Sequence, residues 1–413
     1  MSNAPPPDVS DTPECAVRAA YARHHDAVTA AERCVALLGA IQPVLLLVFC
    51  GGKHDPAAVL GTLLSAYGPV PVVGGSAAGA IGCGQFGCSG LELGVVAFRA
   101  SDVVPRVHVT RDLLAGESQA GFALARDVAA SAAEEAVVLL FFDSVASTAP
   151  LHLHHASAIM EGFRAGLGGK RLTVIGGGLL TDMNLSDSWV FAGDAVVKHT
   201  AVALVFPPTV RAETTVLHGC RPVSTFMEIT NIEGAVVHEL DGRPALAVVE
   251  EMLGLRLVGD GAADLSLVAT LGEKQGDPFA PYDENAYVNR LILSADRATG
   301  SITLFEPDFH LGAKVQIMAR DNALMLDSAQ RGAAAARERQ ASLRPFLTLY
   351  VDCAGRASAW SGAQIEEAEL VLRNLDPAMP MLGFYSGVEI APFDGHSRPL
   401  DWTGVLAMLG RQP

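Results

Sequence analysis

Several features that would assign this 413-residue chain to a familiar class are missing from its sequence. No apolar run approaches the roughly 20 residues that a transmembrane helix needs. The N-terminus, MSNAPPPDVSDTPE, has no basic region followed by an apolar one, so we expect a disordered tail at 1–13 and no signal peptide. Seven cysteines, an odd number in such a chain, favour reduced thiols and a cytoplasmic location over a disulfide framework.

Basic residues are also scarce. Lys and Arg number 29 against 45 Asp and Glu, which gives a net charge of −16. A surface of this sign repels phosphate groups, so the composition argues against nucleic acid or an anionic membrane as a partner.

Motifs for bound groups are absent as well. The turn GGSAAGAIGCGQFGCSG (74–90) has neither the spacing nor the Lys-Ser/Thr ending of a phosphate loop. Cys83 and Cys88 have no second Cys/His pair at zinc spacing, so we interpret them as free thiols. The chain has no CxxCH motif, so any haem would be held without a covalent bond.

A strand–helix–strand pattern recurs three times. It comprises FLTLYVDCAGR, a helical run and MPMLGFYSGVEI at 346–390, and similar patterns at 44–81 and 137–182. Repeats in the same order indicate duplicated units, and the length suffices for two or three domains. We therefore expect an α/β fold of two mixed-sheet domains, built from repeated αβαβ(β) units with helices packed on the sheets.

Matched residues support the repeat. Cys50 aligns with Cys353 at an offset of 303, Gly74 aligns with Gly383 at 309, and Asp143 takes the place of the cysteines in the middle copy. The run 176–178 (GGG) corresponds to 74–76 (GGS), so we expect two glycine turns to face each other across a pseudo-twofold axis.

The best candidate site lies in the last unit. Parallel strands bring their C-terminal ends to one edge of a sheet, where such folds place their ligands. Arg356 and Glu389 offer opposite charges, which suit a ligand with both an amine and a carboxylate. The alternatives are that Cys353 is a small buried hydrophobe and that Arg356 and Glu389 form a structural ion pair. The expected ligand-binding residues are Cys353, Arg356, Tyr385, Ser386, Glu389, His396, Gly75, Ser76 and Gly177.

With these residues in view, the chain resembles the FIST-domain family over nearly its whole length. The resemblance is carried by VVGGSAAGAI, VIGGG and HGCRPVS in the first half, and by YVNRLILSADRATGSI, GAKVQIMARD, DCAGR and GFYSGVEIAPF in the second. It implies a FIST N-like domain at 14–255, with related units at 14–112 and 113–217 plus connecting strands, and a ligand-binding FIST C-like domain at 270–413. Gly75 and Ala80 stand where the family's first turn tends to have Cys and Glu.

The resemblance also implies a function. FIST-like proteins are thought to be intracellular sensors in bacterial signalling that bind small ligands such as amino acids. Some relatives are haem proteins that sense nitric oxide and act on a histidine kinase or a cyclic-di-GMP enzyme. This chain would signal through such a separate partner protein, and an oligomer is compatible with its sequence.

Three hypotheses follow. We favour a sensor that binds a small ligand, and with it a protein that is not an enzyme. A haem b-binding version needs an axial ligand beside an apolar cavity, for which His218 ranks first and His396 second. A cysteine-dependent enzyme would use Cys353 as nucleophile and Glu389 or His396 as base, with Arg356 lowering the thiol pKa.

Overall fold

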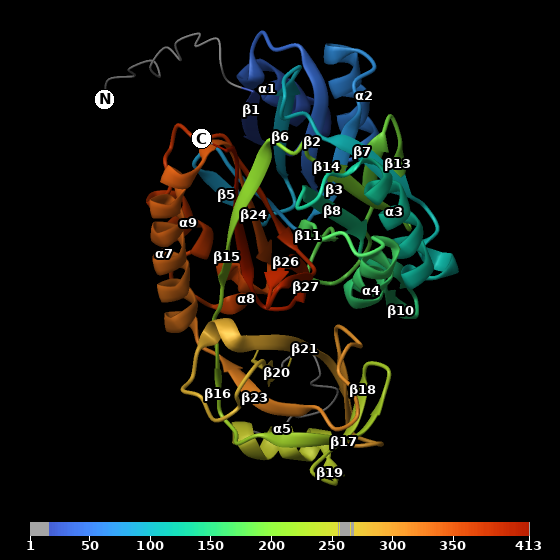
Figure 1. Ribbon diagram of the computed structural model, residues 1–413, viewed down its shortest axis with the longest axis vertical. Coiled ribbons are helices and arrows are strands. Elements are labelled where there is room, and N and C mark those ends of the chain that lie inside the picture. The colour runs from blue at the N-terminus through green and yellow to red at the C-terminus, as the bar shows by residue number, and fades with distance from the viewer. Residues whose placement is uncertain (1–15, 255, 257–264, 266–267, 413) are drawn as a thin grey trace.

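A computed structural model describes residues 16–254, 256, 265 and 268–412. The chain forms two parts (Figure 1): a three-sheet body (residues 16–217 and 322–412), drawn above, and a smaller barrel (residues 220–320), drawn below. The tail expected at 1–13 lies outside the described residues.

The first unit of the three-sheet body surrounds a six-stranded sheet in the order β1-β6-β2-β3-β12-β13. Its helices start and stop at signals that the sequence carries. Asp55 caps α2 ahead of Pro56, and Gly68 ends that helix. Its elements are β1 (Val17–Arg23), α1 (Ala27–Leu38), β2 (Pro43–Gly51), α2 (Pro56–Tyr67), β3 (Val72–Ala77), β4 (Ala80–Gly82), β5 (Gln85–Gly87) and β6 (Glu92–Arg99).

The second and third units repeat this order of elements. The second comprises β7 (Arg106–Thr110), α3 (Glu117–Ser131), β8 (Val137–Asp143), β9 (Val145–Thr148), β10 (Leu151–Leu153), α4 (Ala156–Gly166), β11 (Thr173–Leu179), β12 (Val190–Gly193), β13 (Val196–Val197) and β14 (Ala201–Val205). The third comprises β15 (Val210–Leu217), α7 (Asn322–Arg339), β24 (Arg344–Cys353), α8 (Ser358–Ser361), α9 (Glu367–Asn374), β25 (Met381–Ser386), β26 (Glu389–Phe393), β27 (His396–Leu400) and β28 (Gly404–Arg411).

The three sheets share one strand order, which confirms the repeated units. In each, a central strand (β2, β8 or β24) pairs in parallel with the strand after its helix and antiparallel with the last long strand of its unit. Each sheet then ends in a hairpin that another unit supplies. The hairpin β4–β5 joins the sheet of unit 3, β12–β13 joins that of unit 1, and β26–β27 joins that of unit 2. The units are therefore related as three in a circle, not as two across the expected twofold axis.

Equivalent glycines fix the register between the copies. Gly74 and Gly176 have φ of 109° and 152°, and a Cβ on them would lie 2.1 and 1.9 Å from the carbonyl oxygens of Val48 and Leu140. Gly383 meets the carbonyl of Tyr350 in the same way, at 2.4 Å.

Pairing with these glycines corrects one alignment. Counted from the partners of the glycines, Cys50 is equivalent to Asp352, while Cys353 is equivalent to Asp143 and Gly51. Matching the two cysteines by residue type shifts the register by one residue, which in a strand reverses the face on which a side chain lies.

The inner faces of the three sheets share one hydrophobic core. At its centre the rings of Phe49, Phe141 and Phe384 pack together, with centroids 4.1 Å apart for Phe49–Phe384 and 5.2 Å for Phe49–Phe141. The outer face of each sheet is covered by its own helix pair, α1 with α2, α3 with α4, and α7 with α9 (Figure 1).

The barrel is inserted into the third unit, between β15 and α7, where the other units have the short connections 24–26 and 111–116. Its strands close in the order β23-β17-β18-β22-β21-β20, and β20 pairs back with β23 around a separate core. The elements are β16 (Cys220–Pro222), β17 (Met227–Glu233), β18 (Val236–Leu240), β19 (Arg243–Pro244), α5 (Ala245–Leu253), β20 (Ala269–Lys274), β21 (Tyr287–Asp296), β22 (Ser301–Leu304) and β23 (Lys314–Arg320).

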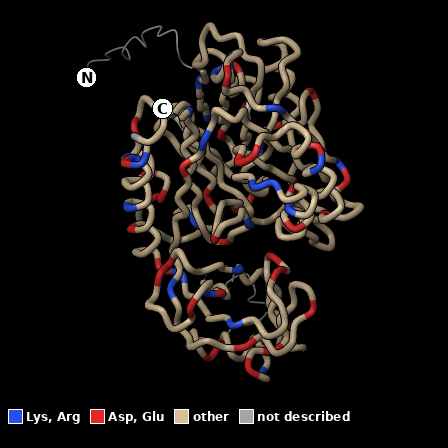
Figure 2. The backbone as a smooth tube through the Cα atoms, in the orientation of Figure 1, with Lys and Arg blue, Asp and Glu red and all other residues tan. Residues whose placement is uncertain are grey.

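Acidic and basic residues are dispersed over both parts of the molecule (Figure 2). Within the described residues, no helix combines the length and the apolar character that crossing a membrane would require.

Candidate functional site

A small cavity lies where the C-terminal ends of β24 and β25 face barrel strand β21. We call it the Cys353 cavity. Its volume is about 80 Å³. Both parts of the molecule supply its walls, which are formed by Leu180, Met183, Leu185, Leu291, Leu293, Phe305, Cys353, Ala354, Gly355, Ser386, Gly387 and Asp401. Of the residues expected at the site, Cys353 and Ser386 line this cavity.

Cys353 is a neutral thiol in this setting. Its residue surface is 6% exposed. Burial, and after it the negative charge of Glu389, raises the pKa of Cys353 well above its ordinary value. Reactive cysteines need the opposite environment, one that favours the thiolate. The geometry therefore gives no support to Cys353 as an activated nucleophile.

Arg356 is fully buried behind the cavity and does not pair with Glu389. Its guanidinium donates to both carboxylate oxygens of Glu367, at 2.9 and 2.5 Å, and lies 3.4 Å from Asp352. It also donates to the backbone oxygens of Trp402 and His218. A buried cation needs paired carboxylates, and α9 supplies the nearest one. Arg356 thus forms a structural ion pair, but with a partner other than the expected Glu389.

Tyr385 is likewise buried and occupied. Its hydroxyl donates to Glu366 at 2.8 Å. Burial, and next the charge of Glu366, raises the pKa of Tyr385 well above its ordinary value, so the phenol stays protonated. Tyr385 ties β25 to the start of α9 and does not line the cavity.

Glu389 contacts Ser386 but does not itself line the cavity. It accepts hydrogen bonds from the Ser386 hydroxyl at 2.6 Å and from the backbone N–H and hydroxyl of Thr403 at 3.1 and 3.0 Å. Burial raises the pKa of Glu389 to about 8 despite these donors. The Glu389 carboxyl therefore gains or loses its proton near neutral pH. Ser386 lies between this carboxyl and the cavity.

Charged residues join the barrel to the three-sheet body beside this cavity. Arg290 on β21 donates to both oxygens of Asp308 at 2.5 Å and lies 3.8 Å from Asp401. Asp401 accepts from the backbone N–H of Leu291 at 2.9 Å. Glu306 from the barrel accepts from the first N–H groups of α4, those of Ala156 and Ser157.

Two of these carboxyls titrate near neutrality. Burial raises the pKa of Asp401 and of Glu306 to about 7 each. The charge balance across the junction between the two parts therefore depends on pH in the physiological range.

Three further expected residues, Gly75, Ser76 and Gly177, lie where a hairpin from one unit pairs with the sheet of another. A Cβ on Gly75 would lie 2.3 Å from the oxygen of Trp189, and one on Gly177 would lie 2.4 Å from the oxygen of Val388. The Ser76 hydroxyl accepts from the N–H of Trp189. These residues sit inside paired strands and line neither the Cys353 cavity nor the cavity that contains His396.

The side chain of His218 could ligate a metal, but the packing around it leaves no room for a haem. Burial, and then Arg356, lowers the pKa of His218 to about 3, so the imidazole is neutral. Neither ring nitrogen has a hydrogen-bond partner among the described residues. The bare face of the adjacent Gly219 is filled by Met325 and Arg356, whose atoms lie 2.8 and 3.1 Å from where a Cβ would be. The packing around His218 does not fit a haem.

His396 lies apart from the Cys353 cavity, as the exposed first residue of β27. It lines a second cavity, between α4, β27 and the barrel loop that carries Asp308. The polar lining of this second cavity is unlike the apolar pocket that haem needs.

Several residues central to the junction are not evident from local sequence patterns. Glu366 and Glu367 fall within a predicted helical run, although two adjacent acids near a buried arginine are a signal for pairing. Arg290 and Asp401 lie in segments that local patterns cannot bring together, since they are distant in sequence and meet across the two parts.

Comparison with known proteins identifies the family. The FIST N domain matches residues 44–243, and the FIST C domain matches residues 245–392. The chain belongs to the FIST family. FIST domains are sensory domains of signal transduction proteins. The boundary between the two matches falls at β19, inside the barrel, so FIST N and FIST C each contribute to both parts of the molecule.

Two curated proteins that resemble this chain come from mycobacteria. The chain is 29% identical over 239 residues to the uncharacterized protein MT0656 of Mycobacterium tuberculosis. It is 29% identical over 238 residues to the uncharacterized protein Mb0898c of Mycobacterium bovis. Each match covers 57% of this chain and 60% of the relative. The solved structure of T. maritima PurL complexed with ATP aligns over 96% of this chain and 71% of that one, at 9% identity and a TM-score of 0.19, too low to carry an argument.

Proposed function

We propose that this FIST protein is a ligand sensor in which a small molecule binds in the Cys353 cavity and alters the contact between the barrel and the three-sheet body. The observation that carries the proposal is the origin of the cavity walls. Cys353 and Ser386 come from the body, and Leu291 and Leu293 from the barrel. A ligand that touches both parts can bind one arrangement of the two parts more tightly than another. It then shifts the population toward that arrangement, which is what a sensor requires.

The lining also describes the ligand. Leucines, Met183 and Phe305 offer apolar contacts, while Ser386, Asp401 and the Cys353 thiol offer a few polar ones. Because Arg356 and Glu389 are both buried and satisfied, they do not present the opposite charges that suggested an amino acid-like zwitterion. A small, largely apolar molecule with one or two polar groups suits this cavity better.

The signal would pass to a separate protein, such as a histidine kinase or a cyclic-di-GMP enzyme. The barrel is suited to pass on the signal because it connects to the body through β15 and α7 and meets it at the charged junction and at the Cys353 cavity. A partner that binds one arrangement of the two parts would read the ligand through the population of that arrangement.

Gly355 offers a direct test. It lines the cavity, and a Cβ on it would make ordinary contacts of 3.8 Å, so a side chain can be added there without backbone clash. We expect a thermal-shift screen of amino acids and small alcohols to find compounds that stabilise the wild-type protein by about 2.7 kcal/mol at 100 times their Kd. Gly355→Leu should abolish this stabilisation, and the control Gly61→Ala on the open face of α2 should retain it. Equal stabilisation of Gly355→Leu would place the ligand elsewhere.

The haem-binding, nitric-oxide-sensing alternative rests on the neutral, unpartnered ring of His218. Because the space beside that ring is filled, we expect titration with hemin to produce no Soret band of a histidine-ligated haem. A Soret band that disappears in His218→Ala would establish this alternative. One that disappears in His396→Ala would assign the haem to the second cavity.

A further inference from the structure

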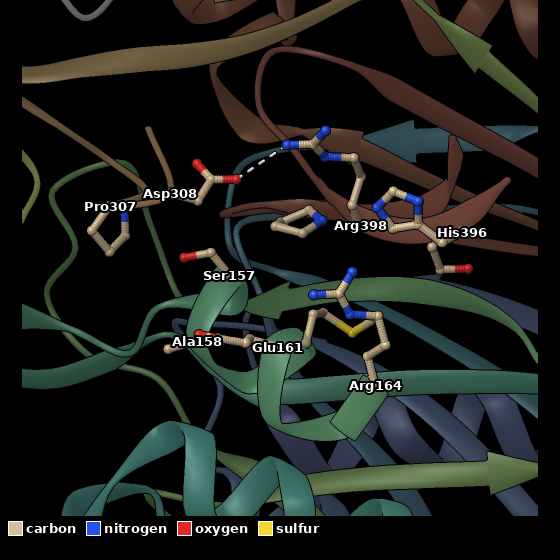
Figure 3. A pocket seen from close by; sticks show the side chains of 11 residues that line it. Ser157, Ala158, Glu161, Arg164, Pro307, Asp308, His396 and Arg398 are labelled. Carbon is tan, nitrogen blue, oxygen red and sulfur yellow. Dashed lines mark hydrogen bonds and ion pairs between the residues drawn. The ribbon is translucent and has the colours of Figure 1, made fainter. Parts of the chain in front are cut away.

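The second cavity has a volume of about 430 Å³. Arg290 links it to the Cys353 cavity, because it pairs with Asp308 of the second cavity and lies 3.8 Å from Asp401 of the first. We call the second cavity the Arg164–Arg398 cavity. It is lined by α4, by β27 and by the barrel loop before β23 (Figure 3). Nothing in the proposed sensor mechanism uses it.

Basic side chains converge on this cavity from two elements. Arg164 comes from α4, and His396 and Arg398 come from β27 (Figure 3). Arg164 makes no hydrogen bond or ion pair within the described part of the chain. Convergent basic groups stand out in a chain whose net charge is −16.

The charge of Arg398 is poorly compensated. Its side chain is 18% exposed, and its ion-pair partner is Asp308 at 3.3 Å. Asp308 also accepts from two nitrogens of Arg290 at 2.5 Å, so Arg398 shares its partner with a second guanidinium group, which itself lies 3.8 Å from Asp401. Burial, and next the charge of Arg290, lowers the pKa of Arg398. An anion in the cavity would give Arg398 a second partner.

Two acidic residues, Asp308 and Glu161, line the same cavity. Glu161 lines the cavity but is exposed and forms no ion pair among the described residues. Glu306 is occupied by the first N–H groups of α4, so neither it nor that helix start is available to a ligand.

We propose that the Arg164–Arg398 cavity binds a small organic anion through a carboxylate or phosphate group. The two guanidinium groups would donate charge-assisted hydrogen bonds to the oxyanion, the pairing for which arginine is best suited. This site differs in place and in ligand chemistry from the Cys353 cavity. Because Asp308 and Pro307 belong to the barrel, a bound anion would also contact both parts of the molecule.

Calorimetric titration of the full chain with inorganic phosphate and, separately, with succinate tests the proposal. We expect saturable binding of at least one probe, weakened about tenfold by Arg164→Gln, the loss expected when one charge-assisted hydrogen bond is removed. Arg398→Gln should weaken it at least as much, with circular dichroism as a check on folding. Binding of phosphate alone or of succinate alone identifies the oxyanion, and either result supports the site.

Arg126→Gln is the matched control because Arg126 is an exposed arginine on neighbouring α3 that makes no ion pair among the described residues. It should bind both probes as the wild type does. The proposal is overturned if the wild type binds neither probe at millimolar concentration. It is equally overturned if Arg126→Gln and Arg164→Gln weaken binding alike, since that shows attraction to overall charge. Gly355→Leu should leave anion binding intact, which separates this test from that of the sensor cavity.

Discussion

Buried ionisable side chains gather where the third unit meets the barrel. Arg356 is matched by Glu367 and Asp352, and Arg290 by Asp308 and Asp401. Groups of this kind are costly to bury, and removing one member leaves the other without compensation. Substituting one member of such a pair should therefore change the free energy of unfolding by a measurable amount.

Arg356→Met should destabilise the protein by about 3–5 kcal/mol, because it leaves Glu367 and Asp352 buried without their cation. Urea unfolding followed by circular dichroism measures this loss. The double variant Arg356→Met, Glu367→Gln should recover part of it, since the second change removes one of the orphaned charges. A stable Arg356→Met protein that has merely lost ligand binding would return Arg356 to the binding site expected from the sequence.

Stability should also fall as the pH rises from about 5 to 8. Burial raises the pKa of Glu389 to about 8 and those of Asp401 and Glu306 to about 7. Between the ordinary carboxyl pKa and these values, the folded chain holds more protons than the unfolded chain. Each such group then lowers the free energy of unfolding by about 1.4 kcal/mol per pH unit.

Glu389→Gln removes one of these groups while keeping the shape that Ser386 and Thr403 surround. Urea midpoints at several pH values should show a shallower decline for this variant, and the wild-type slope for Glu32→Gln on the exposed face of α1. An unchanged slope in Glu389→Gln would mean that the carboxyl is already ionised at pH 5.

At the scale of elements, the glycines of the parallel strands decide whether each unit can form. Gly176→Ala would set a methyl group 1.9 Å from the oxygen of Leu140 at a φ of 152°, so both the contact and the backbone oppose it. We expect insoluble protein or a loss of several kcal/mol, read as a lower thermal midpoint.

Gly61→Ala is the contrasting change. Gly61 lies inside α2 with no atom within 4 Å of a Cβ position, so alanine should stabilise the protein by about 1 kcal/mol through helix propensity. Equal effects at Gly61 and Gly176 would show that close approach of the strands is not what requires glycine.

The sequence predicted these elements well because their signals are local. Apolar β-branched strands such as 137–143, followed by a helix and a glycine-rich strand, identify a strand–helix–strand unit wherever they occur. The sheet that each hairpin joins is not a local property. Residues 80–87 have the pattern of a hairpin, but no feature of this segment predicts that it pairs with β25.

The candidate site was predicted only in part for a similar reason. Cys353 and Ser386 were placed at one cavity because strand ends follow from the parallel pairing. The partners of Arg356 and Tyr385 come from α9 and the residue before it, and the opposing wall comes from the barrel. Neither these partners nor the barrel wall could be inferred from strand order. Side chains from a helix or from another part of the molecule meet a strand through tertiary packing, and the hydrophobic periodicity of the sequence does not encode that packing.

At the scale of the whole molecule, the barrel is an addition to a body that already has its own core. The inner core takes residues from all three sheets and includes Val288 from the barrel. The separate barrel core contains Ile229, Leu271 and Ile317. Although Val288 joins the inner core, most apolar residues of the barrel pack within the barrel core, so we expect the two parts to be separable.

Replacing residues 219–320 by a connection as long as 111–116 should leave a folded three-sheet body. Asp321 is retained in this variant because it caps α7 by accepting from Ala323 and Leu324. We expect a cooperative thermal transition at a lower temperature, with Trp402 more exposed because Arg320 no longer covers its ring. Tryptophan fluorescence and calorimetry measure both effects. A chain without a cooperative transition would show that the body depends on the barrel.

The circular exchange of hairpins bears on how the chain folds as it leaves the ribosome. In the sheet of the second unit, β8 has both of its neighbouring strands once β14 has emerged, yet the edge of β11 must wait for β26 and β27, which follow the barrel in the chain. The third sheet waits longer still, because β28 enters between β15 and β24. Nascent chains interrupted before residue 389 would therefore carry an open β11 edge, and such fragments should be ready substrates for chaperones and proteases.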